Sequence, residues 1–199
     1  MDDETRDLWV FAYGSLLWNP GFSHVERQPA RIRGYHRSLC VYSHVHRGTP
    51  ERPGLVLGLD RGGACRGLVY RVDVAQRLAT LRYLRAREQV TSIYIETMLG
   101  AELDDGRLVR AVTYVVDRKH HQYSGPLPVE TMVAHVKESA GRSGRNLDYV
   151  LASHAKMMEL GIRDATLAAL AMRLETSAGE TLNGPAVTTL TGPSPENQR

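Results

Sequence analysis

The hydrophobic pattern of this chain changes its period at Pro128, and that change limits the folds that the chain can adopt. Before Pro128, short apolar or alternating runs predict β-strands, separated by turn residues. The predicted strands cover residues 9–12, 31–42, 55–59, 67–72, 93–99 and 108–116. After Pro128, apolar residues recur every three or four positions, which predicts helices over 128–140, 147–161 and 164–178.

Tight turns set the predicted topology of the first half. Residues 60–63, Asp-Arg-Gly-Gly, predict a hairpin between two of the strands, and residues 104–106 predict another turn. Short strands joined in this way, with one helix over 74–88, indicate a small, mostly antiparallel barrel or strongly curved sheet. The fold class is therefore α+β, in a single domain over residues 1–178. Residues 179–199 lack periodicity and are rich in Gly, Pro, Thr and Ser, which predicts a loose tail.

Composition and charge argue against several classes of partner. The 199 residues are 42% hydrophobic and 24% charged, and no apolar run reaches the roughly 20 residues that span a bilayer. The N-terminal MDDETRD lacks the apolar core of a secretory signal. The net charge of +3 comes from dispersed arginines without interleaved aromatic residues, which favours a small anionic ligand over nucleic acid. Two cysteines without CxxC spacing, Cys40 and Cys65, favour a reduced, cytoplasmic protein.

The predicted helix over 74–88 ends on a carboxylate in an unusual position. Its apolar stripe consists of Val74, Leu78, Leu81 and Leu84, and Glu88 projects onto the same stripe. Burial and the negative end of the helix dipole both disfavour an ionised carboxylate there, so they raise its pKa toward the range of a general base. The pattern leaves an alternative open, in which Glu88 pairs with Arg85 at the surface.

A second unusual segment interrupts an apolar run, WVFAYGSLLW, with Tyr13, Gly14 and Ser15. Glycine allows successive backbone N–H groups to face an anion or a carbonyl, although an ordinary turn after a strand gives the same pattern. Ser15 does not stand in a GxSxG motif, because Leu17 replaces the second glycine, so the sequence does not favour a serine hydrolase.

Other candidate sites are weaker. The pairs His44/His46 and His120/His121 lack a third ligand at a convincing spacing, so no metal site is expected. The segment 141–146 lacks the lysine of a phosphate-binding loop. Tyr123, before a Gly-Pro turn, is a candidate for a hydroxyl directed into a cavity or for an aromatic residue at its rim.

Several segments together resemble one known family. WVFAYGSLLW, GYHRSLCVYSHVHRGTPERPGLVLGLDRGGACRGLVYRV, LRARE, QYSGP and SGRNLDYV follow one another in the order found in ChaC-like γ-glutamylcyclotransferases that act on glutathione. The resemblance covers roughly residues 8 to 175. The YGSL motif is shared with related γ-glutamylamine cyclotransferases, whereas HRGTP, GxxxRG and SGRN at this spacing make the assignment specific.

The resemblance implies a small mixed, mostly antiparallel β-barrel with helices packed alongside. It implies conversion of glutathione to 5-oxoproline and cysteinylglycine without cofactor or metal. Other γ-glutamyl amides as substrates and a non-catalytic binding module remain alternatives. The family's general base corresponds to Glu88. The residues implied to bind substrate are Val10, Phe11, Ala12, Tyr13, Gly14, Ser15, Leu16 and Tyr123.

Two positions depart from the family pattern, and one part of the site stays unassigned. Ala12 and Ser92 stand where the family often has glycine, which leaves the substrate range open. Arg37, Arg47 and Arg145 are candidates for binding the carboxylate of the Cys-Gly half, and their spacing does not rank them.

Overall fold

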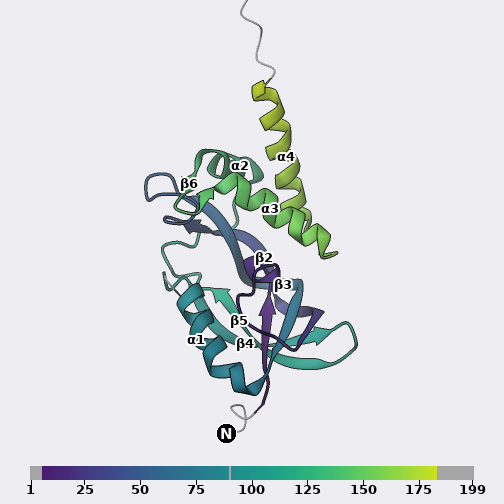
Figure 1. Ribbon diagram of the computed structural model, residues 1–199. Helices are drawn as coiled ribbons and strands as arrows, with labels where there is room; N and C mark the ends of the chain where they lie inside the picture. Colours follow the sequence, from purple (N-terminus) through teal and green to yellow (C-terminus); the bar gives the residue numbers. More distant parts are fainter. Residues whose placement is uncertain (1–5, 90, 183–199) are drawn as a thin grey trace, which may run out of the picture.

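The computed structural model describes residues 6–89 and 91–182. Five strands in this part close into a barrel in the order β1-β3-β2-β4-β5 (Figure 1). They are β1 (Leu8–Ala12), β2 (Glu26–Ser43), β3 (Gly54–Val72), β4 (Tyr94–Leu103) and β5 (Leu108–Val116). Neighbouring strands run antiparallel except β1 and β5, whose parallel pairing closes the barrel. The predicted mixed, mostly antiparallel barrel is therefore confirmed.

The strands β2 and β3 are longer than the sequence predicts, and they pair along almost their whole length. The predicted hairpin at residues 60–63 is wrong. Gly62 and Gly63, both with positive φ, lie within β3 opposite Gly34, and the chain reverses earlier, between β2 and β3 at residues 44–53. Two residues facing one form a β-bulge, which bends both strands around the barrel. A glycine pair suits a bulge as well as a tight turn, so only the pairing with β2 decides between them.

Helices flank the barrel on two sides. The helix α1 (Arg77–Glu88) follows the short 3₁₀ turn η2 (Val74–Gln76) and ends at the residue that the sequence predicts. The second half of the chain forms α2 (Val129–Glu138), α3 (Asn146–Glu159) and α4 (Ala165–Leu182), with the small hairpin β6 (Ala140–Gly141) and β7 (Gly144–Arg145) between α2 and α3. No helix in the described part of the chain is long and apolar enough to cross a membrane.

The helix α4 extends past the expected end of the folded domain. It runs to Leu182, so residues 179–182 are helical and the predicted start of the loose tail at 179 is wrong. Residues 183–199 lie outside the described residues. The start of α4 is fixed by Asp164, whose Oδ1 accepts a hydrogen bond from the backbone N–H of Leu167 at 3.0 Å, as an N-cap does.

One continuous core joins the helices to the barrel. Leu57 of β3 belongs to the same buried cluster as Met132 of α2, Val150 of α3 and Leu170 of α4, and a second cluster of strand residues forms around Phe11. Figure 1 shows α2, α3 and α4 gathered at one end of the barrel and α1 along its side. This packing brings the end of β1, the end of α1 and the first turns of α3 around one space.

Candidate active site

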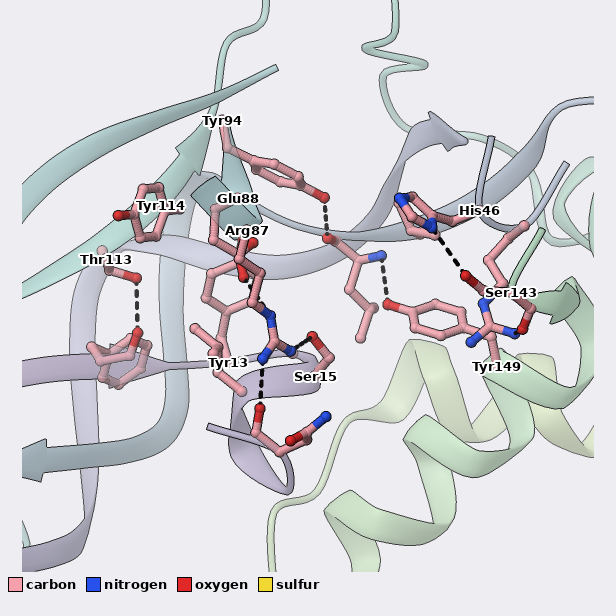
Figure 2. Close-up of a pocket in the computed structure, with 17 residues that line it drawn as sticks. Tyr13, Ser15, His46, Arg87, Glu88, Tyr94, Thr113, Tyr114, Ser143 and Tyr149 are labelled. Atoms are coloured by element: carbon pink, nitrogen blue, oxygen red, sulfur yellow. Dashed lines mark hydrogen bonds and ion pairs between the residues drawn. The ribbon is translucent and has the colours of Figure 1, made fainter. Parts of the chain in front are cut away.

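A cavity of about 460 Å³ occupies that space (Figure 2). Cavities of this size hold small-molecule substrates. Its lining comes from five parts of the chain: Phe11, Tyr13, Gly14, Ser15, Leu16 and Asn19; His46 and Arg47; Val56 and Leu57; Arg87, Glu88, Tyr94, Thr113 and Tyr114; and Ser143 and Tyr149. Glu88 is the only carboxylate in this described lining, so the site combines one acid with several hydrogen-bond donors.

The turn after β1 lines the cavity with residues whose backbone N–H groups lack an acceptor in the described part of the chain. Beyond Ala12 the chain enters the 3₁₀ turn η1 (Ser15–Leu17), where the N–H of Leu17 donates to the carbonyl of Gly14 at 2.9 Å. The first N–H groups of a helical turn have no partner within it. Among the described residues, the N–H groups of Gly14, Ser15 and Leu16 make no hydrogen bond. The turn is therefore a set of donors available to a ligand.

Glu88 is the last residue of α1, and its side chain faces the cavity with 17% of its surface exposed. Burial raises the pKa of this carboxyl above its ordinary value, and the charge of Arg87 acts in the opposite direction, with Nε 3.3 Å from Oε1. The alternative pairing with Arg85 is not formed, because Arg85 donates to Glu96 at 2.8 and 2.7 Å. The structure thus places Glu88 inward on the same side as the buried Leu84, as predicted, while its catalytic role stays a prediction. The rest of the predicted stripe is partly wrong, because Val74 and Leu78 are exposed.

Arg87 connects the end of α1 to the turn after β1. Its guanidinium donates to the hydroxyl of Ser15 at 2.9 Å (Figure 2). Through the other amino group it donates to the carbonyl of Asn19 and the hydroxyl of Tyr83, both at 2.8 Å. The hydroxyl of Ser15 is therefore held by a cation. The helical wheel places Arg87 off the inward stripe, so the sequence gives no signal for these contacts beyond its position next to Glu88.

Tyrosines form much of the wall around Glu88. Burial raises the pKa of Tyr13 and Tyr94 well above the ordinary value, and the neighbouring charge of Glu88 contributes to the same effect. Tyr94 donates to the carbonyl of Leu57 at 2.8 Å, and the hydroxyl of Tyr149 accepts from the N–H of Leu57 at 3.2 Å. These phenols stay protonated at neutral pH. They surround the carboxylate with neutral, poorly hydrated groups, which is consistent with its raised pKa.

The far end of the cavity is positively charged. Figure 2 shows His46, Ser143 and Tyr149 at the opposite side of the view from Glu88. Nδ1 of His46 lies 3.0 Å from the hydroxyl of Ser143, and the guanidinium of Arg47 stacks over the ring of Tyr149 at 5.2 Å. The cavity therefore has the ion pair of Glu88 and Arg87 at one end and the cation of Arg47 at the other, basic end.

Three residues implied to bind substrate do not line this cavity. Val10 and Ala12 are fully buried in the core, because alternate residues of β1 face away from the cavity. Tyr123 also lies outside the lining, so its part in binding stays a prediction. Its hydroxyl donates to Asp60 at 2.8 Å, where a buried carboxylate requires donors.

The two departures from the family pattern also lie away from the cavity. The buried Ala12 packs against Gly67, where an added Cβ would lie 2.1 Å from the carbonyl oxygen of Ala12. Ser92 has a φ of 59°, a left-handed conformation that favours glycine. The family's glycine at this position therefore has a backbone explanation, and neither departure changes the lining of the cavity.

A second cavity, of about 380 Å³, adjoins the first. Arg87, Glu88 and Tyr94 line both of them, and the second also contains His44 and His121, whose rings stack with centroids 6.2 Å apart. Within residues 6–89 and 91–182, no three His, Cys, Asp or Glu side chains are grouped to hold a metal ion.

Comparison with known proteins gives consistent results. The family model for ChaC-like proteins matches residues 8–177. The glutathione-specific γ-glutamylcyclotransferase of Escherichia coli is 32% identical over 157 residues, which cover 79% of this chain and 68% of the relative. The human glutathione-specific γ-glutamylcyclotransferase 1 is 34% identical over 155 residues, which cover 75% of this chain and 69% of the relative.

A solved structure shares the fold. The crystal structure of a γ-glutamyl cyclotransferase specific to glutathione from yeast superimposes with a TM-score of 0.78, covering 86% of this chain and 96% of the yeast chain at 22% identity. The match of the family model to most of the chain, together with these relatives, shows that the chain belongs to the ChaC-like protein family.

Proposed function

We propose that this chain converts glutathione to 5-oxoproline and cysteinylglycine, with Glu88 as the general base. The observation that carries the proposal is the buried carboxylate of Glu88, with a raised pKa, next to a turn that presents free backbone N–H groups. The names of the relatives in Escherichia coli and human support the choice of glutathione among γ-glutamyl compounds.

The substrate supplies its own nucleophile. The α-amine of the γ-glutamyl group attacks the γ-carbonyl carbon and forms the C–N bond of a five-membered lactam. The bond from that carbon to the cysteine nitrogen then breaks, which releases cysteinylglycine. The enzyme has to bring the amine and the carbonyl together, and fixing that geometry contributes several kcal/mol.

Glu88 moves the proton that this exchange requires. The carboxylate accepts a proton from the α-ammonium and returns it to the cysteine nitrogen as the nitrogen leaves. A raised pKa makes the carboxylate a stronger base, and a well-placed general base contributes about 10²- to 10⁴-fold to the rate.

The turn after β1 stabilises the oxygen of the attacked carbonyl. The N–H groups of Gly14, Ser15 and Leu16 have no protein acceptor in the described part of the chain. Arg87 fixes the position of this turn through its hydrogen bond to the hydroxyl of Ser15. One well-placed donor to an oxyanion contributes about 3 kcal/mol to transition-state stabilisation. Phe11 and Tyr13 complete this side of the cavity.

We also propose a cytoplasmic location, where glutathione is abundant and thiols stay reduced. Cys40 and Cys65 are free and buried, and burial raises the pKa of Cys40 to about 12, so neither is suited to disulfide exchange.

The test is incubation of the purified chain with glutathione, γ-glutamylalanine and a γ-glutamylamine in parallel, with mass spectrometry of the products. The proposal expects 5-oxoproline and cysteinylglycine from glutathione and much slower release from the other two. Preferred turnover of another γ-glutamyl compound would assign the alternative cyclotransferase activity. Glutathione that binds in calorimetry and stays intact would assign a binding module.

A further inference from the structure

The basic end of the cavity contains an arginine without a carboxylate partner. Of the two arginines in the lining, Arg87 pairs with Glu88, whereas Arg47 forms no ion pair within residues 6–89 and 91–182. Within the described residues, the side-chain hydrogen bonds of Arg47 all use one amino group, Nη1, which donates to the carbonyls of Ser143 and Arg145. Because a guanidinium has five N–H donors in a fork that matches a carboxylate, the rest of this fork is available to a ligand.

The position of Arg47 is fixed by two loops that are distant in sequence. The N–H of Ser143 donates to the carbonyl of His46 at 2.9 Å, which docks the β6–β7 hairpin against the loop after β2. The approach is so close that a Cβ on Gly141 would lie 2.5 Å from the carbonyl oxygen of Val45. The ring of Tyr149 supports the guanidinium from α3. Arg47 is thus held in place before any ligand arrives, which lowers the entropic cost of binding.

The other arginines that the sequence offers for this task are excluded by their positions. Arg37 is buried and donates to the carbonyl oxygens of Tyr13 and Arg66, both at 2.6 Å, and to Asp164 at 3.2 Å. Neither Arg37 nor the side chain of Arg145 lines the cavity.

We propose that Arg47 binds the C-terminal carboxylate of the leaving dipeptide, and that this contact selects γ-glutamyl peptides over γ-glutamylamines. The inference rests on the proposed function. In glutathione the reacting α-amine and the glycine carboxylate lie at opposite ends of the molecule. In the cavity, Glu88 lies on the opposite side from Ser143 and Tyr149 (Figure 2), the two residues that the guanidinium of Arg47 contacts. A γ-glutamylamine has no carboxylate at its far end and leaves the guanidinium without its ligand.

The test compares glutathione with glutathione carboxamide, which differs only in lacking the terminal negative charge. The wild-type chain is expected to prefer glutathione by roughly 10- to 100-fold in kcat/KM, the range of a hydrogen bond to a charged group. The difference should appear mainly in KM, because the carboxylate is remote from the reacting bonds. In Arg47→Gln the preference should fall to about threefold or less, while turnover of the carboxamide stays near wild type. Arg47→Lys keeps the charge but lacks the forked donor geometry, so its preference for glutathione should lie between those of the wild type and Arg47→Gln.

The matched control is Arg142→Gln, which removes a charge from the same hairpin at an exposed residue outside the lining. It is expected to keep the full preference. The inference is overturned if the wild-type chain treats both substrates alike, if Arg47→Gln keeps the preference, or if it loses activity on both substrates equally. The last result would mean that Arg47 only supports the fold. A wild-type chain that releases 5-oxoproline from neither substrate overturns the proposed function together with this inference.

Discussion

At the scale of single residues, the last two side chains of α1 have different tasks in the cavity. Glu88 supplies the carboxylate, and Arg87 positions it by joining α1 to Ser15 and Asn19 of the turn after β1. Arg87 also affects the strength of the proposed base, because its charge opposes the increase in the pKa of Glu88 that burial causes. The distance between base and turn and the pKa of the base therefore depend on the same guanidinium.

Replacement of Arg87 by methionine should move the pH profile of the reaction. Without the cation, the pKa of Glu88 rises further, so a higher pH is needed to ionise the base. We expect the acidic limb of the kcat/KM profile to shift to higher pH and kcat to fall as the turn loses its anchor. Arg85→Met is the control, because Arg85 binds Glu96 at the surface. An unmoved acidic limb in Arg87→Met would contradict this role.

At the scale of elements, the turn after β1 depends on an arginine from the middle of β2. Arg37 has only 4% of its side chain exposed, and it joins the carbonyl of Tyr13 to Asp164 at the start of α4. This buried ion pair connects the barrel, the turn and the last helix. The turn after β1 and the position of α4 are therefore coupled through the side chain of Arg37.

Replacement of Arg37 by methionine should destabilise the whole fold. It removes the cation that pairs with Oδ2 of Asp164 and the donor to the carbonyl of Tyr13, and breaking a buried pair in this way costs about 3 kcal/mol or more. Arg31→Met, in the same strand, is the control. Its pair with Glu102 is 41% and 47% exposed, so the expected loss is below about 1 kcal/mol. Urea unfolding measures both variants, and equal losses would contradict the coupling.

At the scale of the whole molecule, local patterns predict the elements better than their connections. The change of period at Pro128 predicts the α+β barrel and its helices because side-chain periodicity is a local property. The residues 60–63 were compatible with a turn or a bulge, and only pairing with β2 distinguishes the two. The contacts of Arg47 and Tyr123 likewise depend on chain segments distant in sequence. The helical pattern predicted the inward position of Glu88 but also placed the exposed Leu78 on the same side. The position of Arg87 depends on the turn against which it packs.

The buried carboxylate should reduce the stability of the molecule at neutral pH. Because folding raises the pKa of Glu88, its penalty is absent below about pH 4, where the group is protonated in both states, and is complete above the raised pKa. Glu88→Gln should therefore raise the melting temperature by a few degrees near pH 8, and this gain should shrink toward about pH 4.

The control for this measurement is Glu96→Gln. The hydrogen bond from Arg85 lowers the pKa of Glu96, so ionisation of this carboxyl stabilises the folded state, and its removal should lower the melting temperature at neutral pH. Thermal unfolding followed by circular dichroism at both pH values tests the expected rise in melting temperature for Glu88→Gln and the expected fall for Glu96→Gln. A gain in Glu88→Gln that is equal at both pH values would contradict the assignment of a raised pKa.

The most direct test of the central proposal is the rate at which wild-type and Glu88→Gln proteins release 5-oxoproline from glutathione. The substitution keeps the shape of the side chain and removes its capacity to accept the proton. We predict a fall in kcat of about 10²-fold or more, with circular dichroism showing an unchanged fold. A folded Glu88→Gln protein that releases 5-oxoproline at a rate near that of the wild type would contradict the proposed mechanism.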